Sequence, residues 1–201
     1  IDLLLAARGG FGSAKILELF DWTALKRRNI PVLGYSDLTA FHLAAVKNGC
    51  RKQIFAPMLC SDWLKEENEA YHQTMQSLSN CLQGNENLLP SWHQAEIVQP
   101  GKAAGQLLPA NLSVLCSLIG SRFLPDFQDN ILVLEDINTP AHAVERYLHQ
   151  LYLCGILQQL SGLIFAQFTN CEDDEFLGDI FAEYAQWVKG PVLKNFAFGH
   201  T

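Results

Sequence analysis

The sequence lacks several features that would place it at once in a well-known class of protein. No apolar run reaches the about 18 to 20 residues of a membrane-spanning helix, so we expect no membrane partner. No basic run extends beyond Lys26-Arg27-Arg28 and the formal net charge is -7, so we expect no nucleic acid partner. The six cysteines form no Cys-x-x-Cys pair and no zinc-spaced cluster with histidine, so we expect reduced thiols, no metal and a cytoplasmic location.

The start of the chain lacks an initiator methionine and a basic segment. Its mostly apolar run from Ile1 to Leu5 therefore does not resemble a signal peptide. We expect it to be a strand in the middle of a fold whose first part is missing from this chain. The 201 residues, of which 49% are apolar, suffice for one large domain or two small ones.

Strands and helices alternate in the first part of the sequence. Apolar runs at 2–7 and 30–35 predict strands, and helix-spaced apolar residues follow them at 13–25 and 37–48. A third strand is expected at 53–58. This order predicts a parallel sheet with helices packed on it.

A polar stretch rich in glutamate and glutamine, from residue 61 to 87, interrupts this pattern before strands return. The later expected strands are 94–99, 102–108, 130–134, 162–168 and 191–196, and the later expected helices are 111–119, 144–157 and 179–188. We therefore predict an α/β fold of two domains. The expected division is an N-terminal domain at 1–75, a linker at 76–100 and a C-terminal domain at 101–201.

A serine stands at the turn between the second expected strand and its helix, in Gly34-Tyr35-Ser36-Asp37. A sharp strand-to-helix turn lifts a side chain to the edge of the sheet, beside the free N–H groups of the following helix. This is how a nucleophile elbow presents its serine. The usual Gly-x-Ser-x-Gly pattern fails at Leu38, so the alternative that Ser36 or Asp37 caps the helix stays open.

Glycines also follow the first expected strand, in Arg8-Gly9-Gly10-Phe11-Gly12. Their backbone N–H groups could bind a phosphate or could serve as oxyanion-hole donors for a neighbouring serine. The spacing does not match Gly-x-Gly-x-x-Gly, and a plain tight turn is the third possibility.

Two more candidates lie in the second half of the chain. Glu135 ends the strand expected at 130–134 and is followed by Asp136, and His200 lies on a glycine-flanked loop after the last expected strand. Each alone could be an ordinary loop residue. Together with Ser36 they supply a nucleophile, a base and a carboxylate to orient the base, each from the end of a different strand. This combination favours a serine hydrolase.

These residues, in their context, resemble the LD-carboxypeptidase family of serine peptidases, which includes the microcin-immunity carboxypeptidases. The matching stretches span nearly the whole chain in the order of the family. They are "LLAARGGFGSAKILELFDW", "VLGYSDLTAFHLA", "APML", "ILVLEDINTPAHAVERYLHQLYLCGIL" and "FAFGH".

The resemblance implies that Ser36 is the nucleophile, His200 the general base and Glu135 the carboxylate that holds the histidine. It also implies an oxyanion hole made by the backbone N–H groups of Asp37 and Gly10. In the family, a Rossmann-like or flavodoxin-like N-terminal domain carries the serine and a C-terminal α/β domain carries the glutamate and histidine. The resemblance further implies that no cofactor is needed and that the protein is a homodimer.

The reaction implied by the resemblance is removal of the terminal D-Ala from the murein tetrapeptide, during peptidoglycan recycling in the cytoplasm. Two alternatives stay open: a microcin-immunity enzyme that cleaves an amide between an aspartyl group and a nucleotide, and a non-catalytic muropeptide-binding relative. Where the family has Gly-Gly-Asn-Leu, this chain has Pro109-Ala110-Asn111-Leu112. We expect this loop to line the pocket and Asn111 to bind substrate, so the departure bears on substrate preference.

Overall fold

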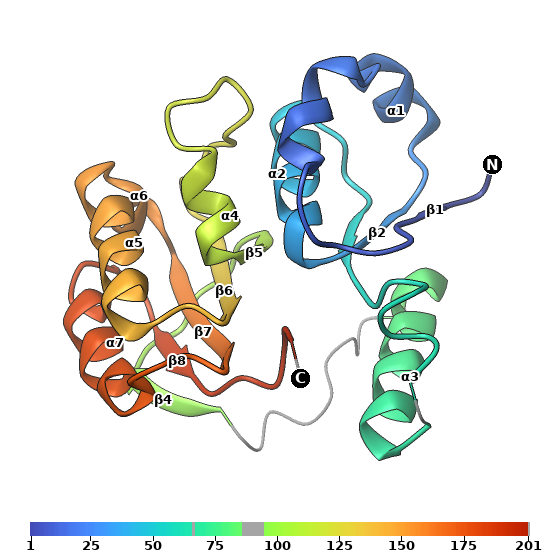
Figure 1. Ribbon diagram of the computed structural model, residues 1–201. Coiled ribbons are helices and arrows are strands. Elements are labelled where there is room, and N and C mark those ends of the chain that lie inside the picture. The colour runs from blue at the N-terminus through green and yellow to red at the C-terminus, as the bar shows by residue number, and fades with distance from the viewer. Residues whose placement is uncertain (66, 86–94, 201) are drawn as a thin grey trace.

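The computed structural model describes residues 1–65, 67–85 and 95–200. Its first sheet has three parallel strands in the order β1-β2-β3, with Leu4 paired to Val32 and Val32 paired to Gln53 (Figure 1). The strands are β1 (Leu4–Leu5), β2 (Val32–Gly34) and β3 (Gln53–Phe55). Parallel pairing requires a crossover between consecutive strands, and helical segments supply it here.

The helical segments of this first half are η1 (Ser13–Leu19), α1 (Trp22–Arg28), η2 (Ser36–Leu38), α2 (Thr39–Lys47) and α3 (Glu69–Gln83). The single helix predicted at 13–25 is therefore wrong. The chain becomes extended at Phe20, and α1 starts anew where the Asp21 carboxylate accepts a hydrogen bond from the Ala24 N–H at 2.9 Å. This N-cap stabilises the start of a second helix, although the apolar residues keep a helical spacing throughout 13–25.

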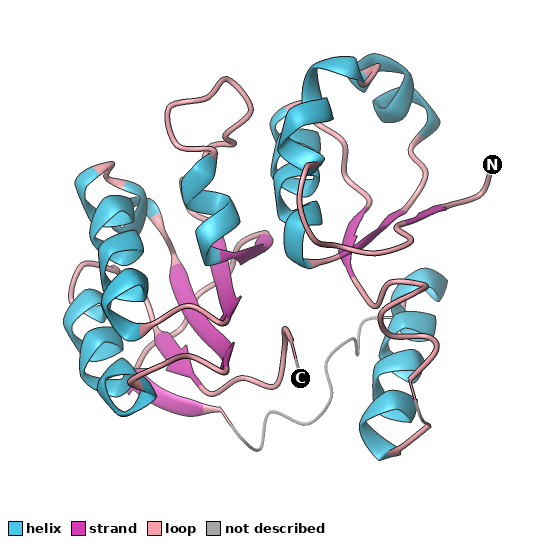
Figure 2. Cartoon of the chain, viewed as in Figure 1, coloured by secondary structure: helices cyan, strands magenta, loops and turns pink. Residues whose placement is uncertain are grey.

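The second sheet has five strands in the order β4-β8-β7-β6-β5. Only the β4–β8 pair is antiparallel, and the other neighbours are parallel (Figure 2). The strands are β4 (Glu96–Gln99), β5 (Leu107–Asn111), β6 (Ile131–Ile137), β7 (Gly162–Thr169) and β8 (Val192–Lys194). The predicted α/β class is confirmed by these two sheets and their helices.

Helices of the second half lie on one face of this sheet, and α4 is the one nearest α2 (Figure 1). They are α4 (Leu112–Ser117), α5 (Ala141–Leu153), α6 (Ile156–Gln159), η4 (Asp174–Phe176) and α7 (Leu177–Ala185). One apolar cluster runs from α2 through β5 and α4 into the second sheet, so the two halves share a continuous core. Residues of that cluster include Leu43, Ala44, Leu108, Leu112 and Leu134.

Two local predictions in this half are wrong. Pro109 and Ala110 form part of β5, where they pair with Val133 and Leu134. They are therefore strand residues and do not form the expected loop. β5 is an edge strand, where a proline without an N–H is tolerated. The helix predicted at 144–157 is split, because Gly155 adopts φ 74° and separates α5 from α6.

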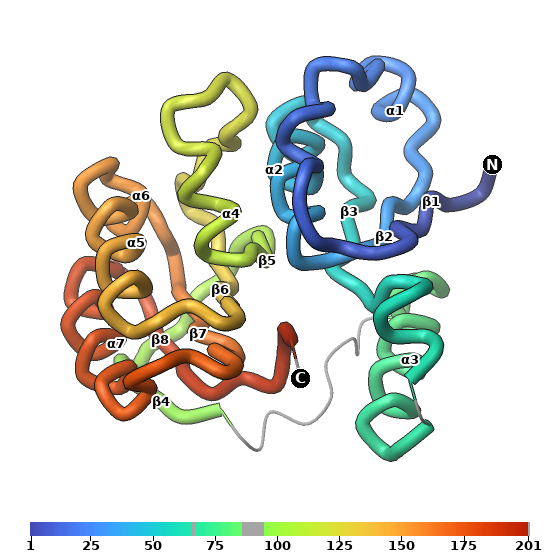
Figure 3. Tube along the Cα trace, in the orientation of Figure 1, coloured from blue at the N-terminus to red at the C-terminus, as the bar shows by residue number. Residues whose placement is uncertain are grey.

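The predicted linker at 76–100 contains the second half of α3 and the whole of β4, while residues 86–94 lie outside the described residues. The division into domains at this position stays a prediction. Helix α3 follows the first sheet in the chain (Figure 3). Its Leu78 belongs to the same apolar cluster as Leu33 and Ala56. Within the described residues, no helix is long and apolar enough to cross a membrane.

Candidate active site

The turn after β2 holds Ser36 in an unusual backbone conformation. Ser36 has φ 61°, in the left-handed region that costs a residue other than glycine about 1–3 kcal/mol. The turn is also tight, because a Cβ on Gly34 would lie 2.9 Å from the Ala6 Cβ and 3.0 Å from the Leu38 Cγ. A strained serine between a strand and a helix is the geometry of a nucleophile elbow.

The glycine turn after β1 lies against this serine. A Cβ on Gly9 would lie 3.2 Å from the Ser36 Cβ and 3.3 Å from its Oγ. Ser13 fixes the far end of the turn, because its N–H donates to Asp37 Oδ2 at 2.9 Å and its hydroxyl donates to the Asp37 carbonyl. The Asp37 carboxylate therefore holds the glycine turn instead of capping α2.

Glu135 and His200 form a close pair. Nδ1 of His200 lies 2.6 Å from Oε2 of Glu135, whose side chain is fully buried, while the histidine side chain is 17% exposed. A carboxylate can only accept, so Nδ1 is the donor of this hydrogen bond and Nε2 makes no contact with Glu135. Gly199 makes the approach possible, because a Cβ there would lie 2.8 Å from the Glu135 Cβ.

The two carboxylates near the C-terminal end of β6 face opposite sides of the sheet. Successive strand residues point to opposite sides. Glu135 faces His200, whereas Asp136 accepts hydrogen bonds from Asn111 Nδ2 at 3.2 Å and from the Ser113 N–H at 2.9 Å on the helix-covered side. The expectation that Glu135 ends the strand is wrong, since β6 continues to Ile137. The register to β7 shifts between Leu134 and Asp136, and such irregularities often re-aim side chains beside active sites.

Tyr35 connects the elbow to the histidine. Its ring centroid lies 4.8 Å from that of His200, and its hydroxyl donates to Asp62 Oδ1 at 3.0 Å. Burial, followed by the negative charge of Asp62, raises the pKa of Tyr35, so the hydroxyl stays a donor. Asp62 also accepts from the Met58 N–H at 2.9 Å. Neither Tyr35 nor Asp62 is a candidate from the sequence, where the one signal is that Tyr35 adjoins Ser36.

Among the described residues, no hydrogen bond joins Ser36 to His200, although the aromatic contact places their segments side by side. Asp37 follows Ser36 directly, and Gly9 contacts Ser36, whereas Gly10 is the next residue of the same turn and its oxyanion-hole role stays a prediction. Asn111 lies apart: it is 4% exposed, and its Oδ1 accepts from the Ser113 hydroxyl and the Val114 N–H. Its substrate-binding role stays a prediction.

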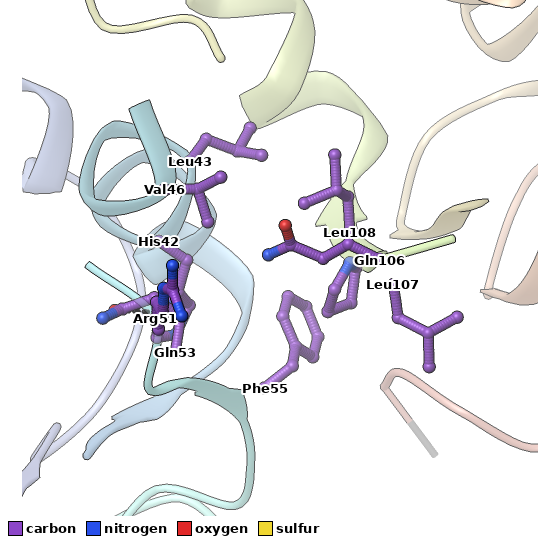
Figure 4. A pocket seen from close by; sticks show the side chains of 10 residues that line it. His42, Leu43, Val46, Arg51, Gln53, Phe55, Gln106, Leu107 and Leu108 are labelled. Carbon is purple, nitrogen blue, oxygen red and sulfur yellow. Dashed lines mark hydrogen bonds between the residues drawn. The ribbon is translucent and has the colours of Figure 1, made fainter. Parts of the chain in front are cut away.

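A small cavity of about 30 Å³ lies behind the elbow, between α2, β3 and β5 (Figure 4). His42 lines it and is hydrogen-bonded on both ring nitrogens, with Nε2 2.8 Å from the Gly34 carbonyl and Nδ1 3.1 Å from Gln53 Oε1. Ser36 and His200 do not line it. Within the described part of the chain, no group of three or more histidine, cysteine or acidic side chains could hold a metal ion.

Comparison with known families matches both halves of the chain. Residues 1–55 match the LD-carboxypeptidase N-terminal domain, and residues 104–201 match the LD-carboxypeptidase C-terminal domain. The first match contains Ser36, and the second contains Glu135 and His200.

Curated relatives match along the whole chain. A murein tetrapeptide carboxypeptidase of Pseudomonas aeruginosa is 31% identical over 212 residues, covering 100% of this chain and 67% of the relative. A probable murein peptide carboxypeptidase of Bacillus subtilis is 30% identical over 210 residues, and this chain spans 64% of its length.

Solved structures share the fold. The muramoyltetrapeptide carboxypeptidase of Oxalobacter formigenes superposes with a TM-score of 0.83 at 27% identity, over 100% of this chain and 70% of that one. The microcin C7 self immunity protein MccF, in complex with aspartyl sulfamoyl adenosine, superposes with a TM-score of 0.84 at 21% identity, over 98% and 67% of the two chains.

Proposed function

Because this chain belongs to the LD-carboxypeptidase family, we propose that the protein is a serine LD-carboxypeptidase acting on murein tetrapeptide. The bond cleaved would join the L-centre of the diamino acid to the terminal D-Ala. The names of the relatives from Pseudomonas aeruginosa and Bacillus subtilis support a murein peptide as substrate. A role in peptidoglycan recycling in the cytoplasm and a homodimeric assembly belong to the same proposal.

The observation that carries the proposal is the 2.6 Å contact between His200 Nδ1 and Glu135 Oε2. A histidine held by a buried carboxylate has its second nitrogen free to take a proton from a nucleophile. The strained Ser36 on the neighbouring segment supplies a hydroxyl of the required kind.

In the proposed reaction, Ser36 Oγ attacks the carbonyl carbon of the scissile amide while His200 Nε2 accepts the hydroxyl proton. His200 then donates this proton to the D-Ala nitrogen as the C–N bond breaks and an acyl-enzyme forms. Water attacks the acyl carbon while His200 Nε2 accepts a proton from it; His200 then returns this proton to Ser36 Oγ as the ester bond breaks and the shortened peptide leaves as a carboxylate. Glu135 keeps the imidazole in the productive tautomer and stabilises its positive charge.

The negative charge that develops on the carbonyl oxygen needs donors. The backbone N–H groups of Gly10 and Asp37 take this role in our proposal, because the glycine turn lies against Ser36 and Ser13 holds it to Asp37. Among the described residues, no backbone hydrogen bond uses the Gly10 N–H, which is therefore free to donate.

The test is release of D-Ala from L-Ala-γ-D-Glu-meso-diaminopimelate-D-Ala, followed by mass spectrometry. We expect release by the wild type and by S117A, a matched serine change on an exposed helix end, and none by S36A. An aspartyl sulfamoyl nucleotide serves as the comparison substrate. Cleavage of this compound alone would favour the microcin-immunity activity, and calorimetric binding of the tetrapeptide without release would favour a non-catalytic role.

A further inference from the structure

A buried polar connection links the serine half of the molecule to the half that carries the histidine pair. The Asn111 N–H donates to the Thr39 hydroxyl at 2.9 Å, and the Asn111 side-chain amide donates to Asp136 Oδ1 at 3.2 Å. Thr39 is fully buried, Asp136 is 1% exposed and Asn111 is 4% exposed. Thr39 belongs to α2 of the first half, whereas Asn111 and Asp136 belong to β5 and β6 of the second sheet.

Thr39 and Asp136, the two ends of this connection, lie close in the sequence to Ser36 and Glu135 of the proposed mechanism. Thr39 begins α2, which continues directly from η2, and η2 begins at Ser36. Asp136 follows Glu135 in β6. A short helical segment and a paired strand are both stiff, so the position of Thr39 relative to Asp136 determines the position of Ser36 relative to the Glu135–His200 pair.

Because these groups are buried, the loss of any hydrogen bond in the connection is costly. The Asp136 carboxylate is kept from water and is satisfied by donors, which also include the Ile137 N–H at 2.8 Å and the Thr139 hydroxyl at 3.1 Å. A buried N–H or carboxylate that loses its partner cannot turn to solvent for another. Apolar contacts between α2 and β5 could slide, whereas directional hydrogen bonds at this depth permit one register.

We propose that Thr39 and Asp136 are positioning residues that set the register between the Ser36 elbow and the Glu135–His200 pair. The proposal rests on the proposed function in that Ser36 and His200 must cooperate. It assigns no contact with substrate to either residue. Under this proposal the two acidic residues of β6 have different roles. Glu135 orients the base on one face of the sheet, and Asp136 aligns the nucleophile from the other face.

The test compares T39V, which keeps the side-chain shape but removes the hydroxyl, with T39S, which keeps the hydroxyl. T74V makes the same change on the exposed surface of α3 and serves as the control. D136N replaces one of the two acceptor oxygens with an NH₂ donor, so the Asn111 amide and the Ser113 N–H can no longer both be satisfied. For each protein we would measure kcat and KM for the tetrapeptide, the rate at which a fluorophosphonate labels Ser36, and the thermal unfolding midpoint.

We expect T39V and D136N to lower both kcat and the labelling rate about tenfold or more with KM little changed, because small misplacements of reacting groups are costly. T39S should stay within about threefold of the wild type. A lower unfolding midpoint with an unchanged kcat and labelling rate for the folded protein would show a structural role only and overturn the proposal.

The labelling arm separates this inference from the proposed function. If the wild type is labelled at Ser36 but releases no D-Ala, the substrate assignment fails while the effect of T39V on labelling still decides the positioning role. If Ser36 of the wild type is not labelled, Ser36 and His200 do not cooperate and the positioning proposal falls with the nucleophile assignment.

Discussion

Oε2 of Glu135 lies 2.6 Å from Nδ1 of His200, although the two residues are 65 positions apart in the sequence. The contact joins the C-terminal part of β6 to the segment that follows β8. A carboxylate acceptor determines both the tautomer and the orientation of the imidazole ring to which it is bonded. Activity and stability should therefore respond to substitutions at this pair and at the Ser36 turn.

The substitution E135Q tests the orienting role of the carboxylate. Glutamine keeps the shape but can present its NH₂ group to Nδ1, which favours the tautomer that cannot accept a proton from Ser36. If Glu135 orients the base as proposed, we expect kcat to fall by about 10²–10⁴-fold with a small change in KM. The exposed variant E183Q should retain wild-type kinetics, and equal kinetics for E135Q would refute the orienting role.

The strain at Ser36 should appear as a difference in stability between two inactive variants. Glycine adopts φ 61° at little cost, whereas alanine does not. We expect S36G to be more stable to urea than S36A by about 1 kcal/mol, after allowing for the greater flexibility of glycine in the unfolded chain. If S36A were the more stable of the two, the left-handed conformation would not be costly in solution.

Adding one methyl group beside Glu135 should misplace the histidine. In G199A the new Cβ would lie 2.8 Å from the Glu135 Cβ, and φ is 116° at this position. We expect kcat/KM to fall about 100-fold, because the loop must shift and carry His200 with it. G84A is the control: its φ is 76° with no atom within 4 Å of the new Cβ, so it should lose about 1 kcal/mol of stability and no activity.

His42 should make the stability of the fold sensitive to mild acid. Burial, opposed by hydrogen bonds to Gln53 and Gly34, lowers the pKa of His42 below its usual value of 6.5. Below about pH 6.5 the unfolded chain therefore binds a proton that the folded protein does not, so the unfolding free energy falls as the pH drops toward the folded pKa. Above about pH 6.5 neither state is protonated there and the contribution is constant.

The measurement for His42 is the unfolding free energy in urea between about pH 7.5 and about pH 5.5. We expect H42Q, which keeps a donor for the Gly34 carbonyl, to lose less stability over this range than the wild type does. H72Q removes an exposed histidine of α3 and should follow the wild type. Parallel curves for H42Q and the wild type would mean that His42 is not held neutral.

The local features of the site could be predicted from the sequence because they depend on neighbouring residues. The glycine, serine and aspartate at 34–37 follow a short apolar strand, and this arrangement is compatible with an elbow or with a helix cap. The strand before Glu135 was likewise visible as an apolar run, although its end was placed too early. An acidic residue after an apolar run predicts the end of a strand. The partner that allows Glu135 to be buried inside the strand, His200, is far away in the sequence.

The rest of the site depends on contacts between distant segments. Thr39 and Asn111 are 72 positions apart, and nothing in the residues around either one indicates that they meet. The loop expected at Pro109 rests on the Gly-Gly-Asn-Leu of the resembling family, and the tolerance of proline in a strand here follows only from the position of β5 at the sheet edge. Tyr35 could be recognised as a neighbour of the histidine only once the last segment was placed.

The place of β8 in the second sheet bears on when the site can exist during protein synthesis. β8 lies between β4 and β7, so the sheet has a gap until this last strand has been made and inserted. Pairings between segments so distant in sequence form slowly. A nascent chain on the ribosome therefore carries the Ser36 elbow before it carries His200, and the Glu135–His200 contact can form only after β8 has been made.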